Sequence, residues 1–153
     1  MTSNPNVIQL KVLALNYRKK VNWLTKLLTG DKSEYHLILA KQDDASQRIA
    51  MGIGEFEGQA IAIALEGMTP SRPLTHDVFK SATDKFGFHL DNTIITHVDK
   101  NGFYYSLLNY TDGQKRVEVD SRPADAIALA LRHNSPIYID KTTFDKFVTV
   151  GTD

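Results

Sequence analysis

Two pairs of strand-like segments, each joined by a polar turn, constrain the fold of this chain more than any other feature of its sequence. The predicted strands are residues 35–41, 47–53, 89–98 and 103–110. The turn of the second pair contains Asn101-Gly102, and such a pair adopts the positive φ of a tight hairpin at little cost. Two antiparallel hairpins with separate helices indicate an α+β fold rather than a regular βαβ repeat.

Hydrophobic patterning predicts the remaining elements around these hairpins. Further strands are expected at residues 7–15, 115–120 and 136–139, and helices at 16–30, 55–67, 76–86 and 123–133, with a helical turn at 143–148. The 55–67 helix is apolar on almost every side, so we expect it in the centre of the fold. Thr75 is predicted to cap the 76–86 helix. The expected architecture is a single domain with a mixed, mostly antiparallel sheet and three main helices.

Length and composition bound what such a domain can do. A length of 153 residues suits one core, and we divide the chain into a flexible N-terminus (1–6), a domain (7–148) and a tail (149–153). No apolar run reaches the roughly 20 residues that cross a bilayer, and the N-terminus lacks a basic region followed by an apolar one. We therefore expect a cytoplasmic protein without membrane contact.

Cysteine content and charge narrow the chemistry further. The chain has no cysteine, so any metal must be held by oxygen or imidazole ligands. Its formal net charge is zero, which argues against tight nucleic-acid binding through many phosphate contacts. An enzyme that meets phosphates only locally, through a metal or a few arginines, remains compatible with this balance.

Two predicted helix starts concentrate charged side chains. The first is Arg72-Pro73-Leu74-Thr75-His76-Asp77, and the second is Asp120-Ser121-Arg122-Pro123-Ala124-Asp125. Helix N-termini favour anions and position polar side chains, so both are candidate sites. The same residues also have ordinary structural roles, since Ser121 can cap its helix and Arg122 can pair with Asp120.

A third segment, Gly54-Glu55-Phe56-Glu57-Gly58, places Glu57 at the start of the apolar 55–67 helix. The three segments together supply one histidine, two arginines and the carboxylates of Glu57, Asp77, Asp120 and Asp125. This inventory suits phosphodiester hydrolysis, in which carboxylates hold Mg²⁺ or Mn²⁺, the metal activates water and arginine stabilises phosphate charge.

The order and spacing of these three motifs resemble the bifunctional nuclease (BFN) domain family over about residues 48–140. The motif Asp120-Ser121-Arg122-Pro123-Ala124-Asp125 continues into the alanine-rich stretch Ala126-Ile127-Ala128-Leu129-Ala130. The chain departs from the family pattern at about residues 19–30, which look like an insertion, and at Ala50, where a proline is expected. The resemblance implies a bacterial member with an α+β fold, its motifs gathered at one cleft, and a nuclease acting on RNA and DNA.

The first functional hypothesis is a metal-assisted nuclease, a hydrolase with DNase and RNase activity. The catalytic residues would be His76, Asp77, Asp120 and Asp125; Arg72 and Arg122 would bind phosphate; and the metal ligands would be Glu57, Asp120 and Asp125. The alternatives are a non-catalytic binding or regulatory module, whose polar network fixes the helix starts, and a small phosphoesterase. Nucleic acid is the expected partner, and the apolar 19–30 segment favours a homo-oligomer.

Overall fold

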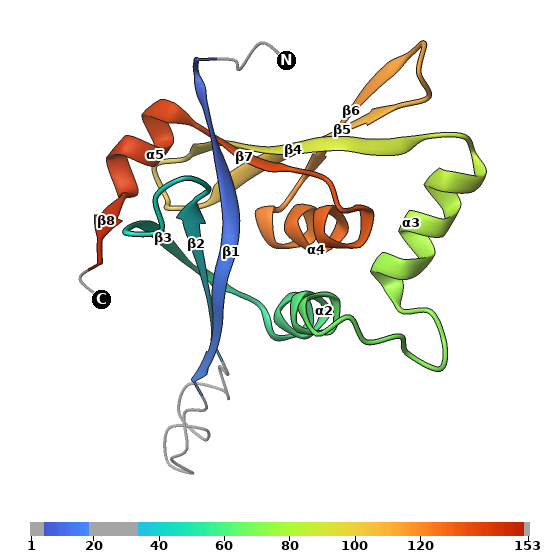
Figure 1. Ribbon diagram of the computed structural model, residues 1–153, viewed down its shortest axis with the longest axis horizontal. Helices are drawn as coiled ribbons and strands as arrows, with labels where there is room; N and C mark the ends of the chain where they lie inside the picture. The colour runs from blue at the N-terminus through green and yellow to red at the C-terminus, as the bar shows by residue number, and fades with distance from the viewer. Residues whose placement is uncertain (1–4, 19–33, 152–153) are drawn as a thin grey trace.

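A computed structural model describes residues 5–18 and 34–151 of the chain (Figure 1). Its strands are β1 (Val7–Arg18), β2 (Glu34–Lys41), β3 (Gln47–Ile53), β4 (His89–Val98), β5 (Tyr104–Thr111), β6 (Arg116–Ser121), β7 (Ile137–Asp140) and β8 (Thr149–Val150). Its helices within the described residues are α2 (Glu55–Leu65), α3 (Thr75–Lys85), α4 (Pro123–His133) and α5 (Lys141–Phe147). The predicted α+β class is confirmed. No described helix has the length and apolar character needed to span a membrane.

All eight described strands form one sheet, in the order β6-β5-β4-β7-β1-β2-β3-β8. The two predicted hairpins are confirmed as the antiparallel pairs β2–β3 and β4–β5. The short strand β7 runs parallel to β4 and antiparallel to β1, and it thereby joins the two halves of the sheet. Strand β8 pairs with β3, so residues 149–150 of the predicted tail belong to the sheet.

The central helix is α4, and the expectation that α2 would be central is wrong. Helix α4 packs on β4 and β5 and against α2 and α3, and Figure 1 shows it in the middle of the molecule. Seven of its residues are buried, whereas α2 buries only Gly58, Ala60 and Ile61. Phe56 of α2 is 81% exposed. Three of the seven apolar residues of α2 are alanines, which lose little when left in solvent, and Leu65 is also exposed, so the pattern overstated the burial of this helix.

Two element boundaries also differ from the prediction. Strand β1 continues to Arg18, so the first three residues of the predicted 16–30 helix are strand, and the remainder lies outside the described residues, as does the predicted 19–30 insertion. Helix α3 is capped at Leu74 rather than Thr75. The Leu74 backbone N–H donates to Asp77 Oδ2 at 2.9 Å, so the cap is provided by a carboxylate inside the helix.

His133, in the last turn of α4, should make the fold sensitive to acid. Its side chain is 4% exposed, with Nδ1 3.9 Å from Asp84 and the ring packed edge-on against Tyr110. Burial, reinforced by Lys80, lowers the pKa of His133 below its ordinary 6.5. As the pH falls, His133 is therefore protonated at a higher pH in the unfolded chain than in the folded protein. We expect the free energy of unfolding to fall as the pH drops below about 6.5.

Denaturant titrations between about pH 7.5 and about pH 5.5 test this expectation. The variant His133→Gln cannot take up the proton, so it should lose less stability over this interval than the wild type. His97→Gln, which changes an exposed histidine on β4, should keep the wild-type pH dependence. Identical pH profiles for the wild type and His133→Gln would contradict the assignment.

Candidate functional site

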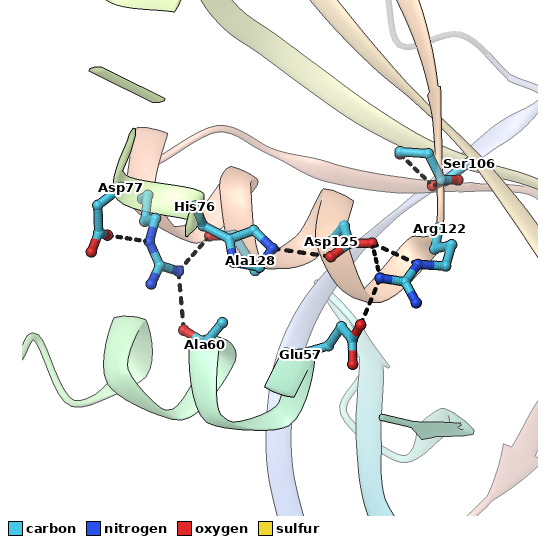
Figure 2. Close-up of polar contacts among 10 residues, drawn as sticks. Glu57, Ala60, His76, Asp77, Ser106, Arg122, Asp125 and Ala128 are labelled. Atoms are coloured by element: carbon cyan, nitrogen blue, oxygen red, sulfur yellow. Dashed lines mark hydrogen bonds and ion pairs between the residues drawn. The ribbon is translucent and has the colours of Figure 1, made fainter. Parts of the chain in front are cut away.

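Four of the predicted site residues form one cluster where α2, α3 and α4 begin. Asp125 Oδ1 lies 3.0 Å from His76 Nε2, and Asp125 Oδ2 accepts from Arg122 Nε at 2.8 Å. Arg122 Nη2 also donates to Glu57 Oε1 at 2.6 Å. Figure 2 shows this chain of contacts, which we call the Asp125 cluster (Glu57, His76, Arg122 and Asp125). The sequence motifs that lie far apart in the chain therefore converge in space.

The hydrogen bond with Asp125 fixes the tautomer of a neutral His76. The hydrogen bond with His76, followed by that from Arg122, holds the pKa of Asp125 below its ordinary value, although burial opposes this. An ionised carboxylate can only accept, so the Nε2 atom of a neutral His76 carries the proton. The lone pair of the ring is then on Nδ1, to which no described residue is hydrogen-bonded. His76 is 14% exposed and is thus a partly sheltered proton acceptor.

Asp77 belongs to a separate contact, with Arg132 at the end of α4. Arg132 Nε donates to Asp77 Oδ1 at 2.6 Å, and Arg132 Nη1 donates to the carbonyl oxygens of Ala60 and Ala128, each at 3.0 Å. Burial disfavours the charge on Asp77, but the hydrogen bonds from Arg132 and from the Leu74 backbone, together with the positive charge of Arg132, outweigh it and lower the pKa of Asp77. Sequence reasoning did not single out Arg132. Its position, seven residues after Asp125 on the same helix face, was the available signal.

Asp120 and Arg72 lie outside both contacts. Asp120 is exposed on β6, where it alternates with the more buried Val119 and Ser121. No described residue forms a hydrogen bond or ion pair with the side chain of Asp120 or Arg72. The expected structural pair of Arg122 with Asp120 is wrong, because Arg122 contacts Glu57 and Asp125 instead.

The donor atoms near the cluster do not fit a metal centre. Among residues 5–18 and 34–151, no group of three or more His, Asp or Glu side chains is placed to hold a metal ion. The two carboxylates of the cluster, Glu57 and Asp125, both accept from Arg122. The predicted third ligand, Asp120, lies on a strand rather than in the cluster. We therefore derive no chemical step through a bound metal.

A pocket of about 250 Å³ adjoins the cluster. Arg122 and Glu57 supply its polar side, and its apolar side is lined by Met51, Ile53, Phe103, Tyr104 and Pro123. The Arg122 side chain is 70% exposed, so part of its guanidinium faces solvent at this pocket. The aromatic lining comes from Phe103 in the β4–β5 turn and from Tyr104, the first residue of β5, neither of which the sequence motifs included.

Gly54 makes room for the carboxylate of Glu57, and this can be tested by stability. A Cβ atom at position 54 would lie 2.2 Å from Glu57 Oε2, so Gly54→Ala must displace that side chain from Arg122. The pair is largely solvated on the arginine side, and we expect the variant to lose at most about 1 kcal/mol of unfolding free energy. Denaturant unfolding provides the measurement.

A double variant separates this cause from a general effect of alanine. In a Glu57→Ala background the obstructing carboxylate is gone, so Gly54→Ala should no longer destabilise the protein. The backbone of Gly54 is extended, with φ −67°, which alanine adopts freely. An equal loss in both backgrounds would exclude the proposed displacement of Glu57.

The fold and the site define the class of this protein as an α+β domain in which three helix starts bring a histidine, an arginine and two carboxylates together. Comparison with known protein families identifies the particular family, because the bifunctional nuclease domain matches residues 37–149. The chain belongs to the bifunctional nuclease domain family. The predicted resemblance is confirmed.

Two relatives illustrate the range of the family. An uncharacterized protein of Mycobacterium tuberculosis is 30% identical over 105 residues, which are 69% of this chain and 62% of that protein. Bifunctional nuclease 1 of rice, Oryza sativa, is 27% identical over 115 residues, which are 72% of this chain and 34% of that protein. The matched region thus spans less than two thirds of either relative.

Proposed function

We propose that this chain is a nuclease that hydrolyses phosphodiester bonds in RNA, in DNA or in both, at the Asp125 cluster. One observation carries the proposal: the two oxygens of Asp125 contact His76 and Arg122 at the same time. A proton-transfer group and a phosphate-binding cation are thereby held on opposite sides of one carboxylate. Membership of the nuclease family and the similarity to rice bifunctional nuclease 1 support the same reading.

The roles of the residues follow from their hydrogen bonds. Asp125 orients the ring of His76, which leaves Nδ1 to accept a proton from the attacking water or to return one to the leaving oxygen. Arg122 Nε and Nη2 are occupied by Asp125 and Glu57, whereas no described residue accepts from Nη1. The Nη1 donors of an exposed guanidinium suit a phosphate oxygen. Glu57 holds the arginine in this orientation.

The charge balance of the cluster bears on whether cleavage requires a divalent cation. Glu57 and Asp125 carry two negative charges against the single positive charge of Arg122. This excess disfavours a phosphate unless His76 is protonated or a cation is added from solution. Because the described residues form no metal centre, the Mg²⁺ or Mn²⁺ requirement expected from the sequence stays a prediction, which the comparison of Mg²⁺, Mn²⁺ and EDTA tests.

Cleavage of labelled single-stranded RNA and DNA tests the function directly. The wild type and Asp125→Asn are purified identically and assayed with Mg²⁺, with Mn²⁺ and with EDTA. We expect cleavage by the wild type and its loss in the folded variant. Equal cleavage by both proteins would indicate a contaminant, and intact substrates in every condition, beside a control nuclease that digests them, would refute the proposal.

A second candidate function, a non-catalytic binding or regulatory module, is favoured by one observation. Glu57, His76 and Asp125 all have partners within the chain, as expected if the cluster only ties three helices together. In that case Asp125→Asn should strongly destabilise the fold and leave no activity to lose. Circular dichroism and denaturant unfolding of the same variant therefore separate the two functions.

A further inference from the structure

We propose that the pocket beside Arg122 receives the base of one unpaired nucleotide while Arg122 holds its phosphate, so that the substrate of this site is single-stranded. The inference rests on the proposed nuclease function and specifies the strand state and the contact surface of its substrate. It is drawn from the shape and lining of the pocket, the placement of Phe103 and the free donors of Arg122.

The lining of the pocket matches the two chemical halves of a nucleotide. Met51, Ile53, Tyr104 and Pro123 give an apolar wall, and Arg122 gives the cation at its edge. A volume of about 250 Å³ is slightly smaller than that of most small-molecule sites, which begin at about 300 Å³. This is room for one planar base beside the guanidinium. A base stacked and paired within a duplex cannot enter such a pocket without being extruded.

Phe103 provides a stacking surface that is held in place. Its side chain lines the pocket and is 67% exposed, although it is a large apolar group. Asp99 Oδ1 accepts from the backbone N–H groups of Asn101 at 2.8 Å and Phe103 at 2.9 Å, which fixes the turn. Gly102, at φ 85°, supplies the positive φ that the turn requires. An exposed aromatic ring on a fixed turn is suited to stacking on any base.

The unpaired donors of Arg122 suit one phosphate rather than an extended anionic surface. Two of its three nitrogens already contact Asp125 and Glu57, so only Nη1 is available to a ligand. Neutral net charge gives no second source of strong phosphate attraction. Affinity must then come largely from the base, because counterion release at one phosphate contributes little.

Fluorescence anisotropy with three hydrolysis-resistant phosphorothioate probes of about 12 nucleotides tests the inference. The probes are a single strand, the same strand in a blunt duplex and the same strand without bases. We expect the single strand to bind about tenfold more tightly than the other two. Phe103→Ala should raise its Kd about tenfold without affecting the baseless probe, and Phe103→Trp should restore binding.

Phe86→Ala is the matched control, because Phe86 is 78% exposed and follows the last residue of α3, away from the pocket. Its Kd for the single strand should equal that of the wild type. Equal binding of the baseless and complete strands, or an unchanged Kd in Phe103→Ala, would overturn the inference. If cleavage of unmodified strands persists in that case, the proposed nuclease function is retained and only the proposal of a base-binding pocket is rejected. Absence of both binding and cleavage would remove the two proposals together.

Discussion

Cleavage of single-stranded RNA and DNA is expected to fall at least about a hundredfold in His76→Ala and in Asp125→Asn, if the chain is the nuclease proposed above. His76→Ala removes the proton-transfer group. In Asp125→Asn the side-chain amide can donate a hydrogen bond to His76 Nε2. This favours the tautomer that carries its proton on Nδ1, so Nδ1 can no longer accept a proton. Initial rates at saturating substrate, with circular dichroism as a check on folding, provide the measurement.

Asp120→Asn and Arg72→Ala are the comparison variants for this experiment. Both residues belong to the set predicted from the sequence, yet neither contacts the Asp125 cluster. Both variants should therefore retain most of the wild-type rate. A loss in Asp120→Asn as large as that in Asp125→Asn would move the site toward β6 and contradict the cluster as its centre.

Arg132→Met should lower the free energy of unfolding by about 3 kcal/mol, because it leaves the partly buried Asp77 without its ion pair. Arg132 is 7% exposed and contacts α2 through Ala60, α3 through Asp77 and its own helix through Ala128. Its loss thus loosens three helices at once. Denaturant unfolding at neutral pH measures the change, and Arg72→Ala, at an exposed arginine, should change stability by less than about 0.5 kcal/mol.

The double variant Arg132→Met with Asp77→Asn identifies the source of this loss. An asparagine at position 77 carries no charge and can still accept from the Leu74 backbone N–H. The double variant should recover part of the stability lost in Arg132→Met. If the two substitutions simply add, the cost lies in the lost carbonyl contacts rather than in an uncompensated carboxylate.

Local signals explain which parts of the fold could be predicted. The β4–β5 hairpin follows from Asn101-Gly102, and α4 follows from Pro123, which occupies its first turn as expected. The central position of α4 depends on which helix is covered by the sheet and by the other helices. The hydrophobic periodicity of a helix does not indicate which neighbours will cover it. Strand β7 was predicted at 136–139, but its parallel pairing with β4 is a long-range choice without a local signature.

The sequence predicted most of the residues of the candidate site but not which of them contact one another. Glu57, His76, Arg122 and Asp125 were found because polar residues at helix starts stand out beside apolar helices. Besides Asp125, the partner of Arg122 is Glu57, 65 residues away, rather than Asp120 two residues away, and the packing of α2 against α4 decides this. Arg132 was missed because a basic residue in the last turn of a helix is ordinary.

The position of β7 has a consequence for synthesis of the protein on the ribosome. Strands β1 to β3 and strands β4 to β6 each pair with their neighbours in sequence, whereas within the sheet, among the described strands, only Ile137–Asp140 joins the two groups. Each group can collapse as it emerges, but the sheet cannot close before residue 140 has left the exit tunnel. A nascent chain stalled before this point would already contain α2 and α4, whose packing brings Glu57 to Arg122, but its sheet would still be in two parts, so closure of the sheet is a late event.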